Sequence, residues 1–311
     1  MCLSAAFFYY FDSFAVCIAL FLIFRAAMIS LVFVMKKMFS VLMAVSAVFA
    51  LCSCASTETK QPRKIAVQMW STHFHKFDYS IERLAKMGVK YVECYPSQLL
   101  SDKMPNAKFS HNMTAEQKAF AKKVLADNGV KMISYGCVGG KTEADIRKVC
   151  AFVAEMGAGT VVTEAQEDTI PIWNKVCGEY GLRMALHSHE RKPKNPAYRH
   201  FDPAFLMTIL KDYKNVGICA DNGAWSRSGL DVVGGFKSVR GKLIEIHLKD
   251  QQTFNDLKSG CTVYGEGVLD MKAILAEVDS QGFDGYFVIE DGTYKDSFPI
   301  IEKNLKYLRE H

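Results

Sequence analysis

The chain has 311 residues, of which 50% are hydrophobic and 23% are charged, and its formal net charge is +5 at pH 7. This composition is typical of a globular protein and excludes an intrinsically disordered one. The lysines and arginines do not cluster on one segment, so the charge pattern gives no indication of a nucleic-acid partner.

Residues 1–53 are predicted to be a leader. Residues 35–54 read MKKMFSVLMAVSAVFALCSC, which places two lysines before an apolar run, small residues and a cysteine. This order is typical of a bacterial lipoprotein signal peptide, cleaved before Cys54 so that this cysteine carries the lipid anchor. The residues before Met35 are also apolar, and we interpret Met35 as the true start; an uncleaved membrane anchor is the alternative. We therefore expect a lipid-anchored periplasmic or cell-surface protein.

The cysteines beyond Cys54 are widely spaced and form no CxxC pair, which argues against a zinc-finger site. A chain of this length can bury a hydrophobic core without disulfides. The sequence therefore predicts buried free thiols at Cys94, Cys137, Cys150, Cys177, Cys219 and Cys261.

A polar linker, residues 54–63, precedes a regular alternation of short β-rich runs and longer helical stretches. Two of these stretches, residues 114–129 and 142–157, begin at a threonine suited to N-capping and end at a glycine suited to helix termination. The predicted strands are residues 64–70, 89–95, 130–136, 159–165, 182–188, 216–221, 243–250 and 285–291.

Eight strands that alternate with helices predict an α/β fold of the (β/α)₈ TIM-barrel type over residues 64–311. The competing architecture, a doubly wound open sheet, needs a glycine-rich phosphate turn after the first strand. That position reads QMWSTHFHKFD and contains no GxGxxG pattern.

Active sites of such barrels lie at the carboxyl ends of the strands. Acidic and histidine side chains occur at nearly every predicted strand end, and such side chains suit Mn²⁺, Mg²⁺, Co²⁺ or Zn²⁺. The candidates are His73, His75, Glu93, Glu164, His187, His189, Glu190, Asp221, His247, Lys249, Asp250, Glu290 and Asp291.

Several segments resemble a known family. They are VKYVECYP, VVTEAQ, ALHSHE, VGICADNGAWSRSGLDVV, IEIHLKD, YGEGVLDMKAIL and YFVIE. Together they resemble the xylose-isomerase-like barrel superfamily of sugar phosphate isomerases/epimerases, which also contains the type IV apurinic endonucleases. Within it, the chain is most similar to lipoprotein members from Bacteroides-type bacteria. The resemblance extends from about Lys64 to the end of the chain.

The resemblance implies a divalent-metal site at the barrel mouth. Relatives hold the ion with an acid, an Asp, a His and a Glu from strands five to eight. Asp221, His247 and Glu290 match by residue type, whereas His187 stands in place of the first acid. A second departure is Ala224 in DNGAWSRSG, where the subgroup usually has a histidine.

The predicted metal set is therefore His187, Asp221, His247 and Glu290, and the predicted catalytic residues are Glu290, Glu164 and His187. The sequence does not decide which of His187 and His189 is the ligand. Structural alternatives are a core histidine for His247, a turn cap for Asp221 and a salt bridge for Glu290. Predicted substrate-binding residues are His189, Glu93, Lys249, Trp225, Arg227 and His73.

The resulting functional prediction is a divalent-metal-dependent isomerase or epimerase that acts on a keto-sugar through an enediolate. The same enolate would support a lyase or hydratase on 3-keto-glycosides. A non-catalytic carbohydrate-binding lipoprotein is the third hypothesis, and Ala224 is the feature that favours it. Location outside the cytoplasm argues against a phosphorylated substrate. Endonuclease activity is not expected, because the extra histidines of a trinuclear zinc site are missing.

Overall fold

The computed structural model describes residues 24–25, 28, 33, 35–40, 62–292 and 296–311. The chain divides into two units, Met1–Gln61 and Pro62–His311. Cys54, the predicted lipid-anchor residue, and most of the predicted linker lie outside the described residues. In the part of the chain that the structure describes, no helix combines the length and the apolar character needed to cross a membrane.

The unit Pro62–His311 is a closed parallel barrel in the strand order β1-β12-β9-β8-β7-β6-β5-β2. The prediction of a TIM barrel is thereby confirmed, and all eight predicted strands are present. The barrel strands are β1 (Lys64–Gln68), β2 (Tyr91–Cys94), β5 (Lys131–Tyr135), β6 (Thr160–Thr163), β7 (Arg183–His187), β8 (Val216–Asp221), β9 (Leu243–Leu248) and β12 (Tyr286–Ile289).

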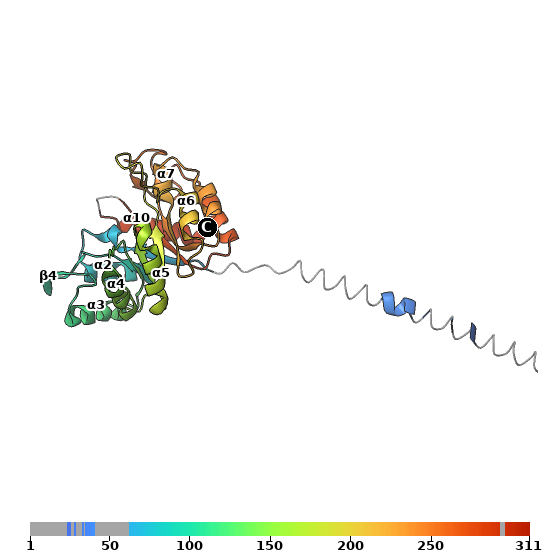
Figure 1. Ribbon diagram of the computed structural model, residues 1–311, viewed down its shortest axis with the longest axis horizontal. Coiled ribbons are helices and arrows are strands. Elements are labelled where there is room, and N and C mark those ends of the chain that lie inside the picture. Colours follow the sequence, from blue (N-terminus) through green and yellow to red (C-terminus); the bar gives the residue numbers. More distant parts are fainter. Residues whose placement is uncertain (1–23, 26–27, 29–32, 34, 41–61, 293–295) are drawn as a thin grey trace, which may run out of the picture. The chain divides into compact units, whose positions relative to one another are not determined.

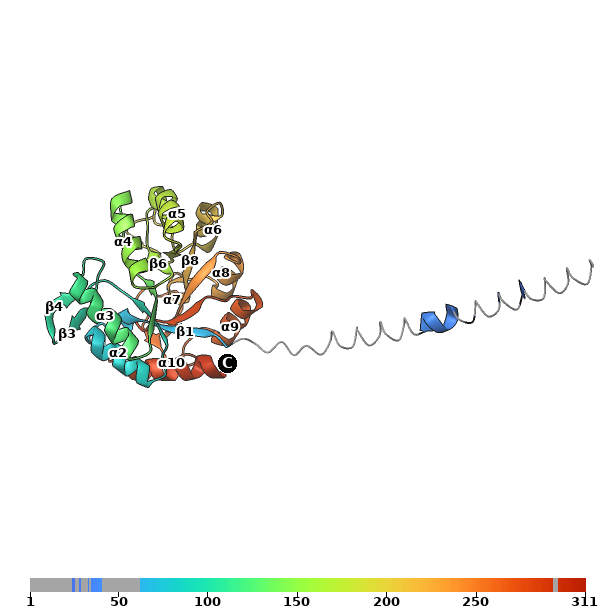
Figure 2. The same cartoon turned by 90° about the horizontal axis from the view of Figure 1, so that it is seen from below.

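Helices surround the strands on the outside of the barrel (Figures 1 and 2). The two helices predicted from capping signals form as expected, because Thr114 and Thr142 each make a capping box. Gly129 and Gly157, which follow these helices, have φ values of +62° and +77°. The helices are α2 (Phe77–Lys86), α3 (Ala115–Asp127), α4 (Glu143–Glu155), α5 (Ile170–Glu179), α6 (Pro203–Leu210), α7 (Asn222–Arg227), α8 (Val232–Ser238), α9 (Met271–Ser280) and α10 (Phe298–Glu310).

Some short elements differ from the prediction. The first strand ends at Gln68, and the chain continues as a 3₁₀ helix, η1 (Met69–Thr72); a second one, η2 (Glu167–Thr169), precedes α5. Two antiparallel ribbons lie in the loops that follow β2 and β9. Their strands are β3 (Leu99–Ser101) with β4 (Met104–Lys108), and β10 (Asp250–Gln251) with β11 (Cys261–Thr262).

The long loop after β9 is tied back to the end of that strand by Asp250. Its carboxylate accepts backbone N–H bonds from Gly265 at 2.9 Å, Gly267 at 3.0 Å and Leu269 at 3.2 Å. A Cβ atom at Gly267 would lie 2.2 Å from Asp250 Oδ1, so only glycine fits. The loop is therefore anchored where the strand enters the barrel mouth.

The main core lies between the strands and the helices and includes fully buried aromatic side chains such as Trp173, Phe77 and Phe236. All six predicted cysteines are free thiols, and five of them are buried as predicted; Cys137 is only partly buried, because it lines the cavity at the barrel mouth. Inside the barrel the packing is different, because Glu93, Glu245 and His247 are buried there with almost no exposed surface. These buried polar residues are continuous with the candidate site, because Glu93 contacts His247.

Candidate metal and active site

Four neighbouring strands bring the predicted metal set together. His187 and Asp221 are the last residues of β7 and β8, His247 lies near the end of β9, and Glu290 directly follows β12. One ligand atom from each of the four side chains lies within 4.8 Å of the others. The parallel register explains this, because Asp221 pairs with His247 and Ile289 with Leu248.

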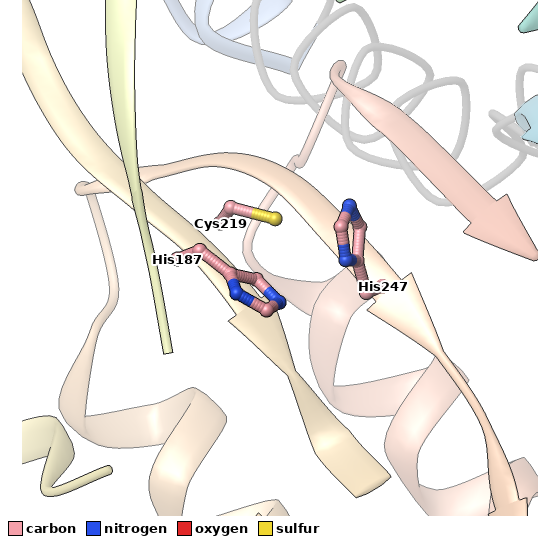
Figure 3. Close-up of side chains that lie close together, drawn as sticks. All are labelled: His187, Cys219 and His247. Atoms are coloured by element: carbon pink, nitrogen blue, oxygen red, sulfur yellow. The ribbon is translucent and has the colours of Figure 1, made fainter. Parts of the chain in front are cut away.

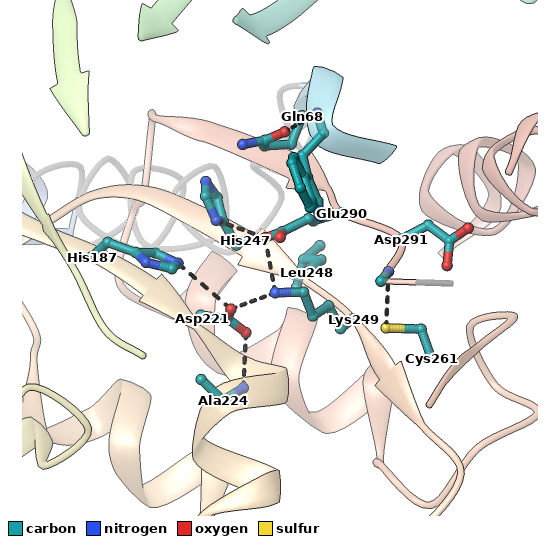
Figure 4. Close-up of polar contacts among 12 residues, drawn as sticks. Gln68, His187, Asp221, Ala224, His247, Leu248, Lys249, Cys261, Glu290 and Asp291 are labelled. Atoms are coloured by element: carbon teal, nitrogen blue, oxygen red, sulfur yellow. Dashed lines mark hydrogen bonds and ion pairs between the residues drawn. The ribbon is translucent and has the colours of Figure 1, made fainter. Parts of the chain in front are cut away.

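Lys249 ties the two carboxylates of this set together (Figure 4). Its Nζ lies 2.5 Å from Asp221 Oδ2 and 2.8 Å from Glu290 Oε2. Burial, the largest single effect, would raise the pKa of both carboxyl groups. The Lys249 charge, acting together with His187 on Asp221 and with His247 on Glu290, holds each pKa below its ordinary value. In the same way the two carboxylates raise the pKa of Lys249 despite its burial. All three groups are therefore charged at neutral pH.

His247 lies between two carboxylates. Its Nε2 is 2.6 Å from Glu93 Oε2, and its Nδ1 is 2.9 Å from Glu290 Oε2. Burial would lower the pKa of His247, but the Cys219 thiol and the carboxylates of Glu93 and Glu290 raise it well above the usual value. Glu93 therefore orients the imidazole from below the site, which is the arrangement that supports a histidine ligand.

His187 is the side chain best explained by a ligand. Both of its ring nitrogens are buried without a hydrogen-bond partner, and Nε2 lies 3.6 Å from Asp221 Oδ2. Its ring centroid is 4.9 Å from that of His247, with the Cys219 thiol beside the two rings (Figure 3). Leaving an imidazole unsatisfied in the interior is costly, so these nitrogens fit a bound cation or substrate.

Alternative groupings of the same residues suit a cation less well. Cys219 could join His187 and His247, but burial raises its pKa to about 12, and a metal-binding cysteine must ionise. Burial likewise raises the pKa of Cys137, which lies near His187 and Glu164. The group of two imidazoles and two ionised carboxylates, Asp221 and Glu290, is therefore the set whose chemistry fits a divalent ion.

A cavity of about 320 Å³ opens beside this group. Trp70 and Tyr95 form an aromatic wall, with ring centroids 5.3 Å apart and an angle of 83° between the planes. The full lining is Gln68, Trp70, Tyr95, Pro96, Cys137, Glu164, His187, His189 and Glu290. A larger concavity of about 870 Å³ lies at the amino ends of the strands, but its lining contains neither an acid nor a histidine.

Glu164 and His189 belong to this cavity. Glu164 lies 3.3 Å from Lys192 Nζ and 3.4 Å from the Tyr198 hydroxyl. Burial opposes ionisation of Glu164, but His189, His187 and Lys192 lower its pKa. His189 shows the opposite balance: burial would lower its pKa, whereas Glu190 at 3.0 Å and Glu164 raise it. The cavity therefore offers an ionised carboxylate and a histidine that holds its proton to higher pH than usual.

Other predicted substrate-binding residues lie elsewhere. Trp225 is fully buried and packs edge to face against Phe236, so its position does not support the predicted stacking on a sugar. Glu93 is buried beneath His247. His73 stacks on Trp70 with centroids 4.3 Å apart and is not part of the cavity lining. Arg227 pairs with Glu190 at 3.1 Å on the loop side of the mouth.

Gln68, Trp70 and Tyr95 line the cavity but were not predicted from the sequence. Gln68 ends β1 on the same face as Ala66, so the two-residue periodicity of strands could have identified it. Trp70 lies in η1, which was predicted to be strand, and Tyr95 follows β2 directly. Trp70 was not predicted because no sequence pattern indicates that the strand ends at Gln68 and that the backbone continues as a 3₁₀ helix.

Comparisons with known proteins agree with this architecture. Residues 81–311 match the model of a family described as xylose isomerase-like TIM barrel. An inosose dehydratase from Geobacillus thermodenitrificans (strain NG80-2) is 26% identical over 199 residues, which cover 51% of this chain and 67% of that protein.

Two solved structures share the fold. A sugar phosphate isomerase/epimerase from Parabacteroides distasonis ATCC 8503 has 17% identity and a TM-score of 0.58, covering 82% of this chain and 96% of its own. A xylose isomerase-like TIM barrel protein from Mycobacterium smegmatis, in complex with magnesium, has 14% identity and a TM-score of 0.62. It covers 80% of this chain and 96% of its own.

Proposed function

Because this chain belongs to the xylose isomerase-like TIM barrel family, we propose that it is a divalent-metal-dependent isomerase or epimerase. Its substrate would be a keto-sugar or sugar derivative that reacts through an enediolate. The observation that carries the proposal is the convergence of His187, Asp221, His247 and Glu290 beside a cavity that Glu164 also enters.

The metal would be held by His187, Asp221, His247 and Glu290, a nitrogen and oxygen donor set that suits Mn²⁺, Co²⁺ or Zn²⁺. When bound, such an ion polarises a carbonyl and an adjacent hydroxyl, which makes the hydrogen between them easier to remove. Glu93 would keep the His247 ring in place through its 2.6 Å contact with Nε2.

Two carboxylates could move the proton from opposite sides of the substrate. Glu164 follows β6 and Glu290 follows β12, and these strands are separated by three strands in either direction around the eight-stranded barrel. Both side chains line the same cavity. Removal of a proton by Glu164 and delivery of another by the carboxyl group of Glu290 to the opposite face of the same carbon would be epimerisation. Return of the proton by Glu164 to the neighbouring carbon would be isomerisation.

The cavity suits an uncharged sugar. Trp70, Tyr95 and Pro96 offer apolar faces for the C–H side of a sugar ring, and the polar lining consists of acids, histidines, Gln68 and a thiol. The lining contains no lysine or arginine that could hold a phosphate. We therefore propose a free keto-sugar or a keto-glycoside as the substrate.

A lyase or dehydratase is the second candidate, because the inosose dehydratase is a relative of this chain. His189 lines the cavity, and its raised pKa favours the protonated form. A protonated imidazole could donate to a departing hydroxyl or glycosyl oxygen after the carbon-bound proton has been removed. The product would distinguish this reaction from epimerisation.

The test is hydrogen exchange in D₂O, followed by NMR. The full chain in mild detergent would be loaded with Mn²⁺ or Co²⁺, then incubated with ketoses and 3-keto-glycosides. The paramagnetic metal would be removed before the NMR spectra are recorded. We expect exchange at the carbon next to the carbonyl, lost with a chelator and reduced about 10²- to 10⁴-fold in Glu290→Gln and Glu164→Gln. Glu302→Gln, an exposed acid on α10, is the matched control.

No exchange with any substrate, in protein that binds both metal and sugar, would reject catalysis. It would favour the hypothesis of a carbohydrate-binding protein, for which Ala224 remains the distinguishing departure.

We also propose that Cys54 carries a lipid anchor and that the protein is periplasmic or at the cell surface. The basis is the order of lysines, apolar run and small residues in residues 35–54. Labelled palmitate is expected to enter the wild-type chain but not Cys54→Ala. Equal labelling of the two would reject the anchor.

A further inference from the structure

Lys249 shares the two carboxylates of the candidate metal set. Its Nζ lies within 2.8 Å of both Asp221 and Glu290, and the side chain is only 4% exposed. His247 and Lys249 are two residues apart on β9 and its continuation, and both reach the inside of the barrel. The candidate site therefore contains a cation of the chain's own.

The position of this ammonium is fixed by packing. The Asn222 side chain accepts from the Lys249 backbone N–H at 2.7 Å and donates to its carbonyl at 2.9 Å. A Cβ atom at Gly223 would lie 2.7 Å from Lys249 Cδ, so the absence of a side chain there makes room for the lysine. These contacts distinguish Lys249 from a surface lysine that meets an acid by chance.

A divalent ion and this ammonium have opposing requirements. Each needs the charges of Asp221 and Glu290, and two cations close together in the interior repel each other strongly. Arg227 is a further positive charge near the site, and it lowers the pKa of both Asp221 and Lys249. An ion that binds both carboxylates must therefore displace the ammonium from them.

We propose that Lys249 is a built-in competitor of the divalent ion, which neutralises Asp221 and Glu290 when no metal is bound and must leave them before an ion binds. The inference rests on the metal set of the proposed function. If Lys249 competes in this way, the folded chain does not need the ion for stability. Its affinity for the metal is then lower than that of the same four ligands without Lys249.

The test is metal binding without substrate. The full chain in mild detergent, stripped with a chelator, would be titrated with Mn²⁺ while free Mn²⁺ is measured by electron paramagnetic resonance. Lys249→Met keeps the length of the side chain and removes its charge. We expect its Kd for Mn²⁺ to be at least about tenfold lower than that of the wild type.

Lys237→Met, an exposed lysine on α8, makes the same change of net charge and should bind Mn²⁺ as the wild type does. Equal or weaker binding by Lys249→Met, including no binding by either protein, would overturn the inference. If Lys249→Met does not fold without metal, it would be refolded in Mn²⁺: recovery of the native near-ultraviolet circular dichroism supports competition, and no recovery rejects it. A chain that shows the affinity difference but no turnover would refute only the proposed reaction.

Discussion

Two acids of the same barrel have pKa values that are shifted in opposite directions. Glu245 lies on β9 with its Oε1 accepting from the Ser134 hydroxyl at 2.8 Å, and burial together with the nearby Glu93 raises its pKa well above the ordinary value. Glu290 is partly buried at the barrel mouth, with its side chain 14% exposed, and Lys249 and His247 lower its pKa against the effect of burial. Depth alone therefore does not decide the charge of a carboxyl group; its partners do.

One strand provides most of this difference. Glu245, His247 and Lys249 follow each other at two-residue intervals along β9 and its extension, so an acid, an imidazole and an ammonium succeed one another toward the mouth. The lower level, around Glu245, holds a hydrogen-bonded acid whose pKa is raised by burial and by Glu93. At the upper level, the Lys249 ammonium is paired with the carboxylates of Asp221 and Glu290. A bound cation or substrate could change these pairings.

The largest effect should come from removing the cation of the upper level. Lys249→Met removes the main positive partner of Asp221 and Glu290, and we expect the free energy of unfolding to fall by about 3 kcal/mol at pH 7 without metal. Both acids have lowered pKa values when folded, so their stabilisation is present above their ordinary values and is lost as pH falls. Urea unfolding should therefore show the deficit shrinking below about pH 4. A deficit that does not depend on pH would indicate lost packing instead.

Changing the lower-level acid should act in the opposite direction. The pKa of Glu245 is raised when folded, so the wild type loses stability as pH rises above the ordinary value toward the folded one. Glu245→Gln keeps the acceptor for Ser134 and removes that loss. We expect a gain on the order of 1 kcal/mol per pH unit over this interval, measured by urea unfolding at pH 5 and pH 8. Equal destabilisation at both pH values would contradict a raised pKa for Glu245.

The smallest effect should come from the hydroxyl that holds Glu245. Ser134→Ala removes one buried hydrogen bond and is expected to lower the free energy of unfolding by about 1 kcal/mol. Ser188→Ala is the corresponding change at the upper level, where the Ser188 hydroxyl accepts from the Asp221 backbone N–H at 2.8 Å. If Ser134→Ala lowers the free energy of unfolding as much as Lys249→Met does, the upper level does not depend on charge pairing more than the lower level does.

Much of the fold followed from local signals. The strand predicted at residues 216–221 has the observed bounds of β8, and the capping threonines at 114 and 142 begin helices as expected. The wider list of candidate residues could be predicted because strand ends of one barrel converge, whatever lies between them in sequence. The choice of the metal set among them came from the resemblance to the family.

Contacts that depend on depth and on helix rotation could not be predicted. Glu93 and His247 are 154 residues apart, and no local pattern shows that they meet. Trp225 was expected at the mouth, but α7 begins directly after β8 and turns this side chain into the core. Lys249 was predicted only as a substrate-binding residue; strand periodicity puts it on the same face as His247, but no sequence pattern shows that Asp221 and Glu290 both reach its ammonium.

The anchor at Asp250 has a consequence for how this barrel can diversify. Gly265, Gly267 and Leu269 are held by that one carboxylate, so the chain is pinned on both sides of the segment between residues 252 and 264. Insertions or exchanges among its exposed residues 252–256 should leave Lys249 undisturbed. Changes at Tyr264 should not, because its hydroxyl donates to the Leu248 carbonyl at 2.7 Å, and Asp250→Asn should loosen the whole loop. Natural variation or the grafting of a new loop can therefore change the rim of the barrel without changing the charged residues inside it.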